Sequence, residues 1–334
     1  MKRMLRRSLK SLAVIGLGIG IGTGFGVGAA RAADPVKINV GWPSPMIGPH
    51  GAGAKAFADE LERLAPGRFK VGFFPGGALG GEREMVEAVQ LGTQEMAIHG
   101  TAILGNFVPD MLVLDVPFLF RDSAHARAVV DGPIGQELIG KMRQRGLVGL
   151  TFGEIGFRHV TSSKRTINVP DDMKGLKIRT MENPIHLAAF RALGALPTPM
   201  SWTEVITGLQ QGTIDGQENP ISILVASKMW ETQKHVTLTR HVFTPISFTM
   251  SAIFFDKLSP ADQEIMRKAA LAGRAANRKY VEEADASGVA EMKKNGMQVV
   301  ETVDAAAFQK KLEPVYKQYS DRFGPMMQRI AAQR

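Results

Sequence analysis

Cysteine is absent from this chain of 334 residues. Its absence excludes disulfide frameworks, thiolate nucleophiles, cysteine-based zinc sites and cysteine-ligated iron–sulfur clusters. Hydrophobic residues make up 44% of the chain and charged residues 22%, close to the averages of globular proteins. This composition excludes a disordered chain and a membrane protein with many spans. The length allows two domains of ~100–200 residues each.

Acidic residues are absent from the first 32 residues, although this segment carries six basic ones. The whole chain has a formal net charge of +9 and a pI of about 9.7. Residues 33–334 hold 35 basic side chains against 32 acidic ones, a net charge of +3. Because this larger part is nearly balanced and shows no basic helix or basic stripe with interleaved aromatic residues, nucleic-acid binding is excluded.

The N-terminal segment has the three parts of a secretory signal peptide. Met1–Lys10 is positively charged, Ser11–Ala30 is an uncharged stretch of apolar residues and glycines, and Ala30-Arg31-Ala32 is an A-x-A cleavage site. The pattern predicts cleavage after Ala32, an extracytoplasmic mature protein and no stable membrane insertion after cleavage. Arg6-Arg7 gives a partial twin-arginine signal, so the Sec and Tat export routes both stay open.

Residues 36–98 alternate between strand and helix patterns. Short apolar or alternating runs predict strands over 36–41, 69–73 and 96–98, and amphipathic spacing predicts helices over 53–64 and 82–90. A β-α-β-α-β series requires a mostly parallel sheet with crossover helices. The fold class predicted from this pattern is α/β.

Three later segments carry helix-start signals. Asn183-Pro184 is an N-cap followed by proline at the first helical position, and Ser201–Glu204 is a capping box. Ser259-Pro260 opens a helix that can run to about Lys294, about 50 Å long, which is more than one domain of this size measures. Apolar residues recur along it at near-helical spacing, at Ile265, Ala269, Ala272, Ala276, Tyr280 and Ala284. We expect this helix to cross two domains, with bends at Gly273 and Gly288.

Catalytic and metal-binding signatures are missing. The chain has no H-E-x-x-H, G-x-S-x-G, Ser-x-x-Lys or P-loop motif, and its seven histidines form no two-ligand helical pair. We therefore expect no metal site, no cofactor and no enzymatic activity.

Anion recognition is the chemistry that remains. Arg179 ends the predicted strand 175–179, and Arg158 lies between apolar stretches. An arginine fork suits a bidentate carboxylate, supplied by a ligand or by an acid of the protein itself. Asn219 offers a donor and an acceptor to a ligand, or acts as a turn or N-cap residue before a proline. Trp202 forms an apolar cleft wall or packs as an ordinary core residue.

Several long motifs occur in a fixed order across residues 33–330. They are Phe74–Gly80 followed by Glu82–Met85, Gly156-Phe157-Arg158, Asp172–Arg179, Pro197–Met200 and Asp215–Pro220. In this order the chain resembles the extracytoplasmic solute-binding proteins of TRAP transporters, the DctP-like family.

The resemblance implies a two-lobed periplasmic-binding-protein architecture, with mixed sheets flanked by helices and a long helix spanning both lobes. We expect lobe I to comprise residues 33–155 and 245–284, and lobe II residues 156–244 and 285–334. The implied function is that of a monomeric periplasmic receptor, which binds a small organic acid and delivers it to the subunits of a TRAP permease driven by an ion gradient.

The resemblance also implies roles for individual residues. Arg179 matches the arginine that clamps the ligand carboxylate, Arg158 a second arginine, and Asn219 a polar contact. Trp202 falls where an aromatic residue is usual, and Glu82 with Arg83 where a lobe I loop approaches the cleft. A partly apolar pocket is expected from Trp42, Pro43, Met46, His99 and Trp202.

The acid itself is left open by the sequence. Pro43 and Gly100 are non-polar where the sialic-acid-binding branch is expected to have polar and acidic residues, so sialate is disfavoured. Small dicarboxylates, 2-oxo or hydroxy acids, sugar acids and aromatic acids remain. Two other functions stay open: the same receptor serving a sensor or chemoreceptor, and an exported enzyme with Arg179 as substrate anchor and a histidine as base.

Overall fold

A computed structural model describes Asp34–Gln333 of this chain. The predicted signal peptide and its cleavage site, residues 1–32, lie outside the described residues. No helix of the described part is both long enough and apolar enough to cross a membrane.

The first part of the described chain forms the predicted β-α-β-α-β series. It consists of β1 (Val36–Gly41), α1 (Pro49–Leu64), β2 (Phe69–Phe74), α2 (Glu82–Leu91) and β3 (Met96–Gly100). Strand β1 pairs in parallel with β2 on one side and with β3 on the other, which confirms the parallel sheet. Helix α1 begins four residues before its predicted start, and Pro49 occupies its first turn. Proline is tolerated there because the backbone N–H groups of the first turn have no partner within the helix.

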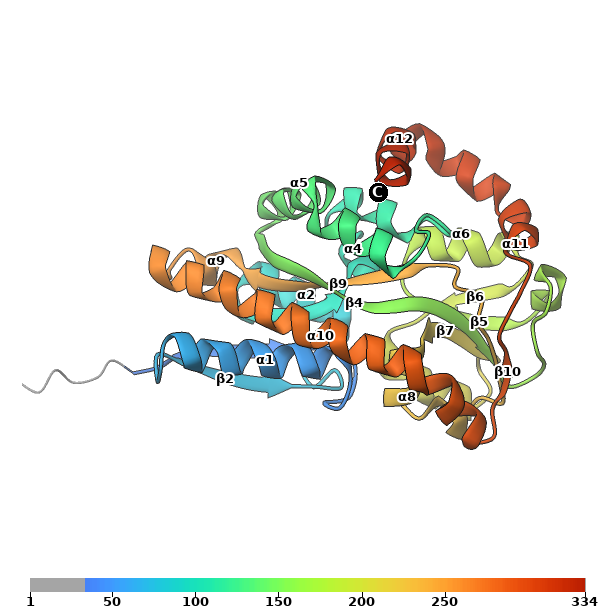
Figure 1. The fold of residues 1–334 in the computed structure, drawn as a ribbon, viewed down its shortest axis with the longest axis horizontal. Helices are drawn as coiled ribbons and strands as arrows, with labels where there is room; N and C mark the ends of the chain where they lie inside the picture. Colours follow the sequence, from blue (N-terminus) through green and yellow to red (C-terminus); the bar gives the residue numbers. More distant parts are fainter. Residues whose placement is uncertain (1–33, 334) are drawn as a thin grey trace, which may run out of the picture. The chain divides into compact units, whose positions relative to one another are not determined.

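Strand β4 (Leu147–Ser162) connects two groups of strands. Its first part pairs antiparallel with β9 (Phe243–Ser251), which also pairs with β3. From Arg158 onward β4 pairs instead with β7 (Gly216–Pro220), and Figure 1 shows this long strand reaching from β9 to β7. The strand order is β2-β1-β3-β9-β4-β7-β5-β6. The predicted lobe boundary between residues 155 and 156 lies near this change of partner, and the division into lobes stays a prediction.

The remaining strands are short. Strand β5 (Lys177–Thr180) pairs in parallel with β6 (Leu196–Pro199) and β7, and β8 (His235–Thr237) pairs in parallel with β10 (Gln298–Val300). The other helices are α3 (Thr101–Leu104), α4 (Ser123–Asp131), α5 (Pro133–Met142), α6 (Pro184–Ala192), α7 (Trp202–Gln210), α8 (Ile221–Ala226), α9 (Ala252–Phe255), α10 (Pro260–Lys294), α11 (Ala305–Lys311) and α12 (Glu313–Ala332), with 3-10 turns at Pro109–Asp115, Arg143–Arg145, Pro170–Met173 and Met229–Glu231.

The predicted helix starts are confirmed by their capping hydrogen bonds. The Asn183 side-chain oxygen accepts from the backbone N–H groups of Ile185 and His186, at 2.9 and 3.2 Å. Ser201 and Glu204 form the capping box of α7, in which the Ser201 N–H donates to the Glu204 carboxylate at 3.2 Å. These caps fix where α6 and α7 begin, next to the strand ends that carry the arginines.

Helix α10 has the predicted bounds and is 35 residues long. Of the apolar residues at near-helical spacing only Ala269 is fully buried, and the buried stripe continues through Gly273, Asn277 and Val281. The Asn277 amide donates to the carbonyls of Pro49 and Glu154, both at 2.9 Å. Glycine and asparagine therefore form part of the buried face of this helix.

Gly273 allows α10 to lie close to α1. A Cβ atom on Gly273 would lie 2.8 Å from the Gly53 carbonyl oxygen and 2.8 Å from the Phe248 ring, whereas a Cβ on Gly140 of α5 would have no neighbour within 4 Å. We expect Gly273→Ala to lower the free energy of unfolding by about 1–3 kcal/mol through overpacking. Gly140→Ala is the matched control and should raise it, by up to ~1 kcal/mol, through helix propensity. Urea denaturation of both variants checks this, and equal effects would contradict the close contact.

Candidate functional site

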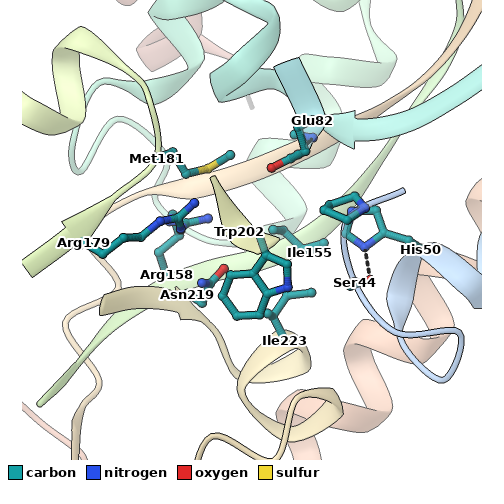
Figure 2. Close-up of a pocket in the computed structure, with 12 residues that line it drawn as sticks. Ser44, His50, Glu82, Ile155, Arg158, Arg179, Met181, Trp202, Asn219 and Ile223 are labelled. Carbon is teal, nitrogen blue, oxygen red and sulfur yellow. Dashed lines mark hydrogen bonds between the residues drawn. The ribbon is translucent and has the colours of Figure 1, made fainter. Parts of the chain in front are cut away.

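A pocket lies where several strand ends and helix starts meet. Its lining combines two arginines, one acid, three neutral polar side chains, a glycine backbone and an apolar remainder (Figure 2). The lining residues are Pro43, Ser44, His50, Glu82, Gly100, Ile155, Arg158, Arg179, Met181, Trp202, Asn219 and Ile223. Such a partly apolar hollow with a few convergent polar groups is typical of a small-molecule site.

Six of the eight residues predicted for the site line this pocket: Arg179, Arg158, Asn219, Trp202, Glu82 and Pro43. The other two lie outside its lining. Arg83 forms an ion pair with Glu87, one turn along α2, at 3.2 Å. His99 is fully buried in β3, with its Nδ1 3.3 Å from the Gly100 carbonyl oxygen. A ligand contact by Arg83 or His99 stays a prediction.

Sequence reasoning missed part of the lining: Ser44, His50, Ile155, Met181 and Ile223. One of these carried a usable signal. Met181 stands two positions after Arg179, and strand alternation places such residues on one face. Ser44 and His50 carried none, because only the folded chain brings their side chains to a separation of 2.8 Å.

Arg158 has an acid partner inside the fold. Its guanidinium forms a two-point ion pair with the Glu218 carboxylate, in which Nη2 donates to Oε1 at 2.8 Å and Nε donates to Oε2. Both side chains are fully buried. Burial alone would raise the pKa of Glu218, but the charge of Arg158 and the hydrogen bonds from His241 and Arg158 hold that pKa well below its usual range. The charge of Arg158 is therefore already matched within the protein.

Arg179 has no such partner among the described residues. Its Nε donates to the Met200 carbonyl oxygen at 2.8 Å, and no carboxylate of residues 34–333 forms an ion pair with it. The side chain is only 2% exposed, and burial lowers the pKa of its guanidinium to about 10. The guanidinium also lies 5.9 Å from the centre of the Trp202 ring. Arg179 is thus a buried cation with hydrogen-bonding capacity left for an anion.

The sequence left two alternatives open for Asn219 and two for Trp202. Asn219 lies in β7, where its side chain donates to the Gln217 amide oxygen at 2.5 Å, and the N-cap of α8 is Pro220. The N-cap reading of Asn219 was therefore wrong. Trp202 is half-buried at the first position of α7, where it packs beside two core clusters and also lines the pocket.

Glu82, Ser44 and His50 supply polar groups from another part of the lining. The Glu82 carboxyl accepts from the Gly100 N–H at 2.9 Å, and burial raises its pKa although that hydrogen bond and the two arginines oppose the rise. The Ser44 hydroxyl lies 2.8 Å from Nδ1 of His50, and burial, with a smaller contribution from His99, lowers the pKa of His50 to about 3. His50 is thus neutral at physiological pH.

Within Asp34–Gln333, no three His, Asp or Glu side chains are grouped to hold a metal ion.

His99 should make the protein sensitive to acid. Burial lowers its pKa to about 4, and its Nε2 has no hydrogen-bond partner among the described residues. Between this pKa and the usual value near 6.5 the unfolded chain binds a proton that the folded chain does not, so stability falls as pH falls. Below pH 6.5 His99 should lower the free energy of unfolding by up to about 1.4 kcal/mol for each pH unit. We expect His99→Phe to abolish this part of the pH dependence. Urea unfolding of the wild-type protein and of His99→Phe at pH 7, 6 and 5 measures the difference. The same pH dependence of stability in both proteins would contradict this role of His99.

The sequence matches a family model described as bacterial extracellular solute-binding protein, family 7, over residues 44–322. A solute-binding protein of Verminephrobacter eiseniae is 51% identical over 274 residues, which cover 82% of this chain and 82% of that protein.

Two solved structures share the fold over most of the chain. A TRAP periplasmic solute-binding protein from Polaromonas sp. JS666, bound to D-erythronate, is 47% identical with a TM-score of 0.88, covering 90% of this chain and 99% of that one. A second, from Bordetella bronchispeptica with density assigned to pantoate, is 46% identical with a TM-score of 0.87 and the same coverage. Both ligands are small organic acids.

Proposed function

Since this chain belongs to the bacterial extracellular solute-binding proteins of family 7, the DctP family, we propose that it is a periplasmic receptor that binds an organic acid through Arg179. The acid is then delivered to a TRAP permease. Members of this family are periplasmic binding proteins. Residues 1–32 act as the export signal, and the mature protein works as a monomer without catalytic activity.

The observation that carries this proposal is the state of Arg179. A buried guanidinium without an acid partner in the described part of the chain is costly, and a ligand carboxylate would supply both the opposite charge and a two-point hydrogen bond. The matched pair of Arg158 and Glu218 lies beside it and keeps the neighbouring positive charge in place. One pocket cation is thus ready for a carboxylate, and the other is held by the protein.

The lining residues also come from both predicted lobes. Glu82 belongs to the segment 33–155, whereas Arg179 and Asn219 belong to 156–244. A ligand that contacts both lobes binds the closed arrangement better than the open one, and so shifts the equilibrium toward closure. The permease would recognise this closed, loaded form.

A thermal-shift screen tests the proposal. The purified protein is unfolded and refolded to remove carried-over ligand, then heated with mono-, di-, keto-, hydroxy-, sugar and aromatic acids, each beside its neutral amide. At 100 times its dissociation constant an acid adds roughly 2.7 kcal/mol to the stability of the folded protein. We expect one class of acid to raise the midpoint by several degrees, its amide to do nothing, and mass spectrometry to recover the acid unchanged. No shift with any acid, or conversion of the acid, would contradict a carboxylate receptor.

A further inference from the structure

The charged groups of the pocket are few and unevenly placed. Among its lining side chains only Arg158, Arg179, Glu82 and His50 can ionise. Arg158 is neutralised by Glu218, and His50 is uncharged because burial lowers its pKa to about 3. One cation, Arg179, and one carboxyl group, Glu82, therefore remain for a ligand. The pocket can balance a single negative charge and holds no second unmatched cation.

Glu82 faces the pocket with spare hydrogen-bonding capacity. It enters the lining from the start of α2, whereas the arginines enter from β4 and β5 (Figure 2). One carboxyl oxygen accepts from the Gly100 N–H at 2.9 Å, and the other forms no hydrogen bond with residues 34–333. Because Gly100 has no side chain, nothing from that position fills the space beside the carboxyl: a Cβ there would lie 3.5 Å from it.

Ser44 and His50 add a neutral polar pair to the same lining. The Ser44 hydroxyl contacts Nδ1 of His50 at 2.8 Å, and the other ring nitrogen, Nε2, forms no hydrogen bond within the described chain. In either tautomer Nε2 offers one donor or one acceptor without charge. A ligand hydroxyl, which both donates and accepts, suits Nε2 and the Glu82 carboxyl alike.

We propose that this pocket selects organic acids with one carboxylate and several hydroxyl groups, and that Glu82 and the Ser44–His50 pair exclude dicarboxylates. The inference rests on the proposed function, in which Arg179 holds the first carboxylate. Hydroxyl groups of the ligand pair with Glu82 and His50. A second carboxylate would instead be buried beside Glu82 with no cation to match it, which is the kind of repulsive contact that gives specificity.

Four-carbon acids provide a matched test by calorimetric titration of the protein purified after expression of the full chain. Erythronate has one carboxylate and three hydroxyls, butanoate has the carboxylate alone, and succinate has two carboxylates; pantoate is a second hydroxylated monocarboxylate. We expect erythronate or pantoate to bind most tightly, and succinate about 100-fold or more weakly than the better of them. Succinate or butanoate binding within tenfold of the better hydroxy acid overturns this selectivity and leaves the receptor function intact. Failure of every acid, here and in the thermal screen, overturns the receptor function itself.

Glu82→Gln tests the residue assigned to the exclusion. The change replaces the carboxyl group with a neutral amide and keeps the size of the side chain, so it should narrow the affinity ratio of hydroxy acid to succinate at least tenfold, chiefly through tighter succinate binding. Glu84→Gln is the matched control, because Glu84 lies exposed in the first turn of the same helix and outside the lining. If folded Glu82→Gln protein keeps the wild-type affinity ratio of hydroxy acid to succinate, Glu82 does not contribute to the exclusion of dicarboxylates.

His50→Phe provides an independent variant. It keeps a ring in place and removes the polar nitrogens, so affinity for the hydroxy acid should fall about tenfold while affinity for butanoate stays the same. An equal loss for both acids would mean that His50 only supports the shape of the pocket, and would remove the Ser44–His50 pair from the proposal.

Discussion

Replacing Arg179 with alanine is expected to weaken binding of the organic acid about 1000-fold, while the protein keeps its fold. The loss is large because Arg179 is the one pocket cation in the described chain without an acid partner, so no other group can match the ligand charge. The fold persists because removing this guanidinium breaks no ion pair and costs one hydrogen bond, to Met200. Calorimetric titration with the acid found by the thermal screen measures the loss, and circular dichroism verifies the fold.

Two further variants separate charge from geometry. Arg179→Lys keeps the positive charge but should also bind poorly, because an ammonium group cannot reproduce the two-point fork of a guanidinium. Arg191→Ala is the control, since Arg191 is an exposed arginine in the last turn of α6 and lies outside the pocket lining. Wild-type affinity in Arg179→Ala, or an equal loss in Arg191→Ala, would remove Arg179 from the binding site.

We expect Glu218→Gln to lower the free energy of unfolding by about 3–5 kcal/mol. The substitution leaves the Arg158 guanidinium buried without a matching charge, and breaking a buried ion pair from one side costs more than the pair contributes. His241 also loses its carboxylate partner, which lies 3.2 Å away. Urea denaturation at neutral pH measures the effect against the wild-type protein.

The ion pair offers its own controls. In the double variant Arg158→Met/Glu218→Leu no charge is left unmatched, so it should recover much of the stability lost in Glu218→Gln. Glu60→Gln breaks an ion pair on the surface of α1, with Arg63, and should change stability little. A loss in Glu218→Gln no larger than that in Glu60→Gln would show that the buried pair does not hold this region together.

Much of the fold follows from short-range patterns. Strand alternation, the Asn183 cap and the Ser201–Glu204 capping box predicted elements that the structure confirms. These signals depend on residues within one turn or one strand, so the sequence carries them directly. The buried face of α10 does not follow from apolar spacing, because Gly273 and Asn277 make its contacts through close approach and hydrogen bonds.

The site required both motifs and tertiary structure. Motif order pointed to Arg158 and Arg179 together, but only the fold distinguishes them. The partner of Arg158 is Glu218, 60 positions away along the chain, and no spacing rule connects two strands at that separation. The contact of Ser44 with His50 crosses the turn between β1 and α1 and likewise appears only in the folded chain. Local patterns therefore locate candidate residues, and tertiary contacts show which of them still has unpaired hydrogen-bond donors for a ligand.

A crystal structure of the refolded protein with its tightest-binding acid would show whether Arg179 holds the ligand. We expect the acid in the pocket of Figure 2, with its carboxylate in a two-point hydrogen bond to Arg179 and with Arg158 still paired to Glu218. An acid bound elsewhere, or one whose carboxylate lies away from Arg179, would contradict it.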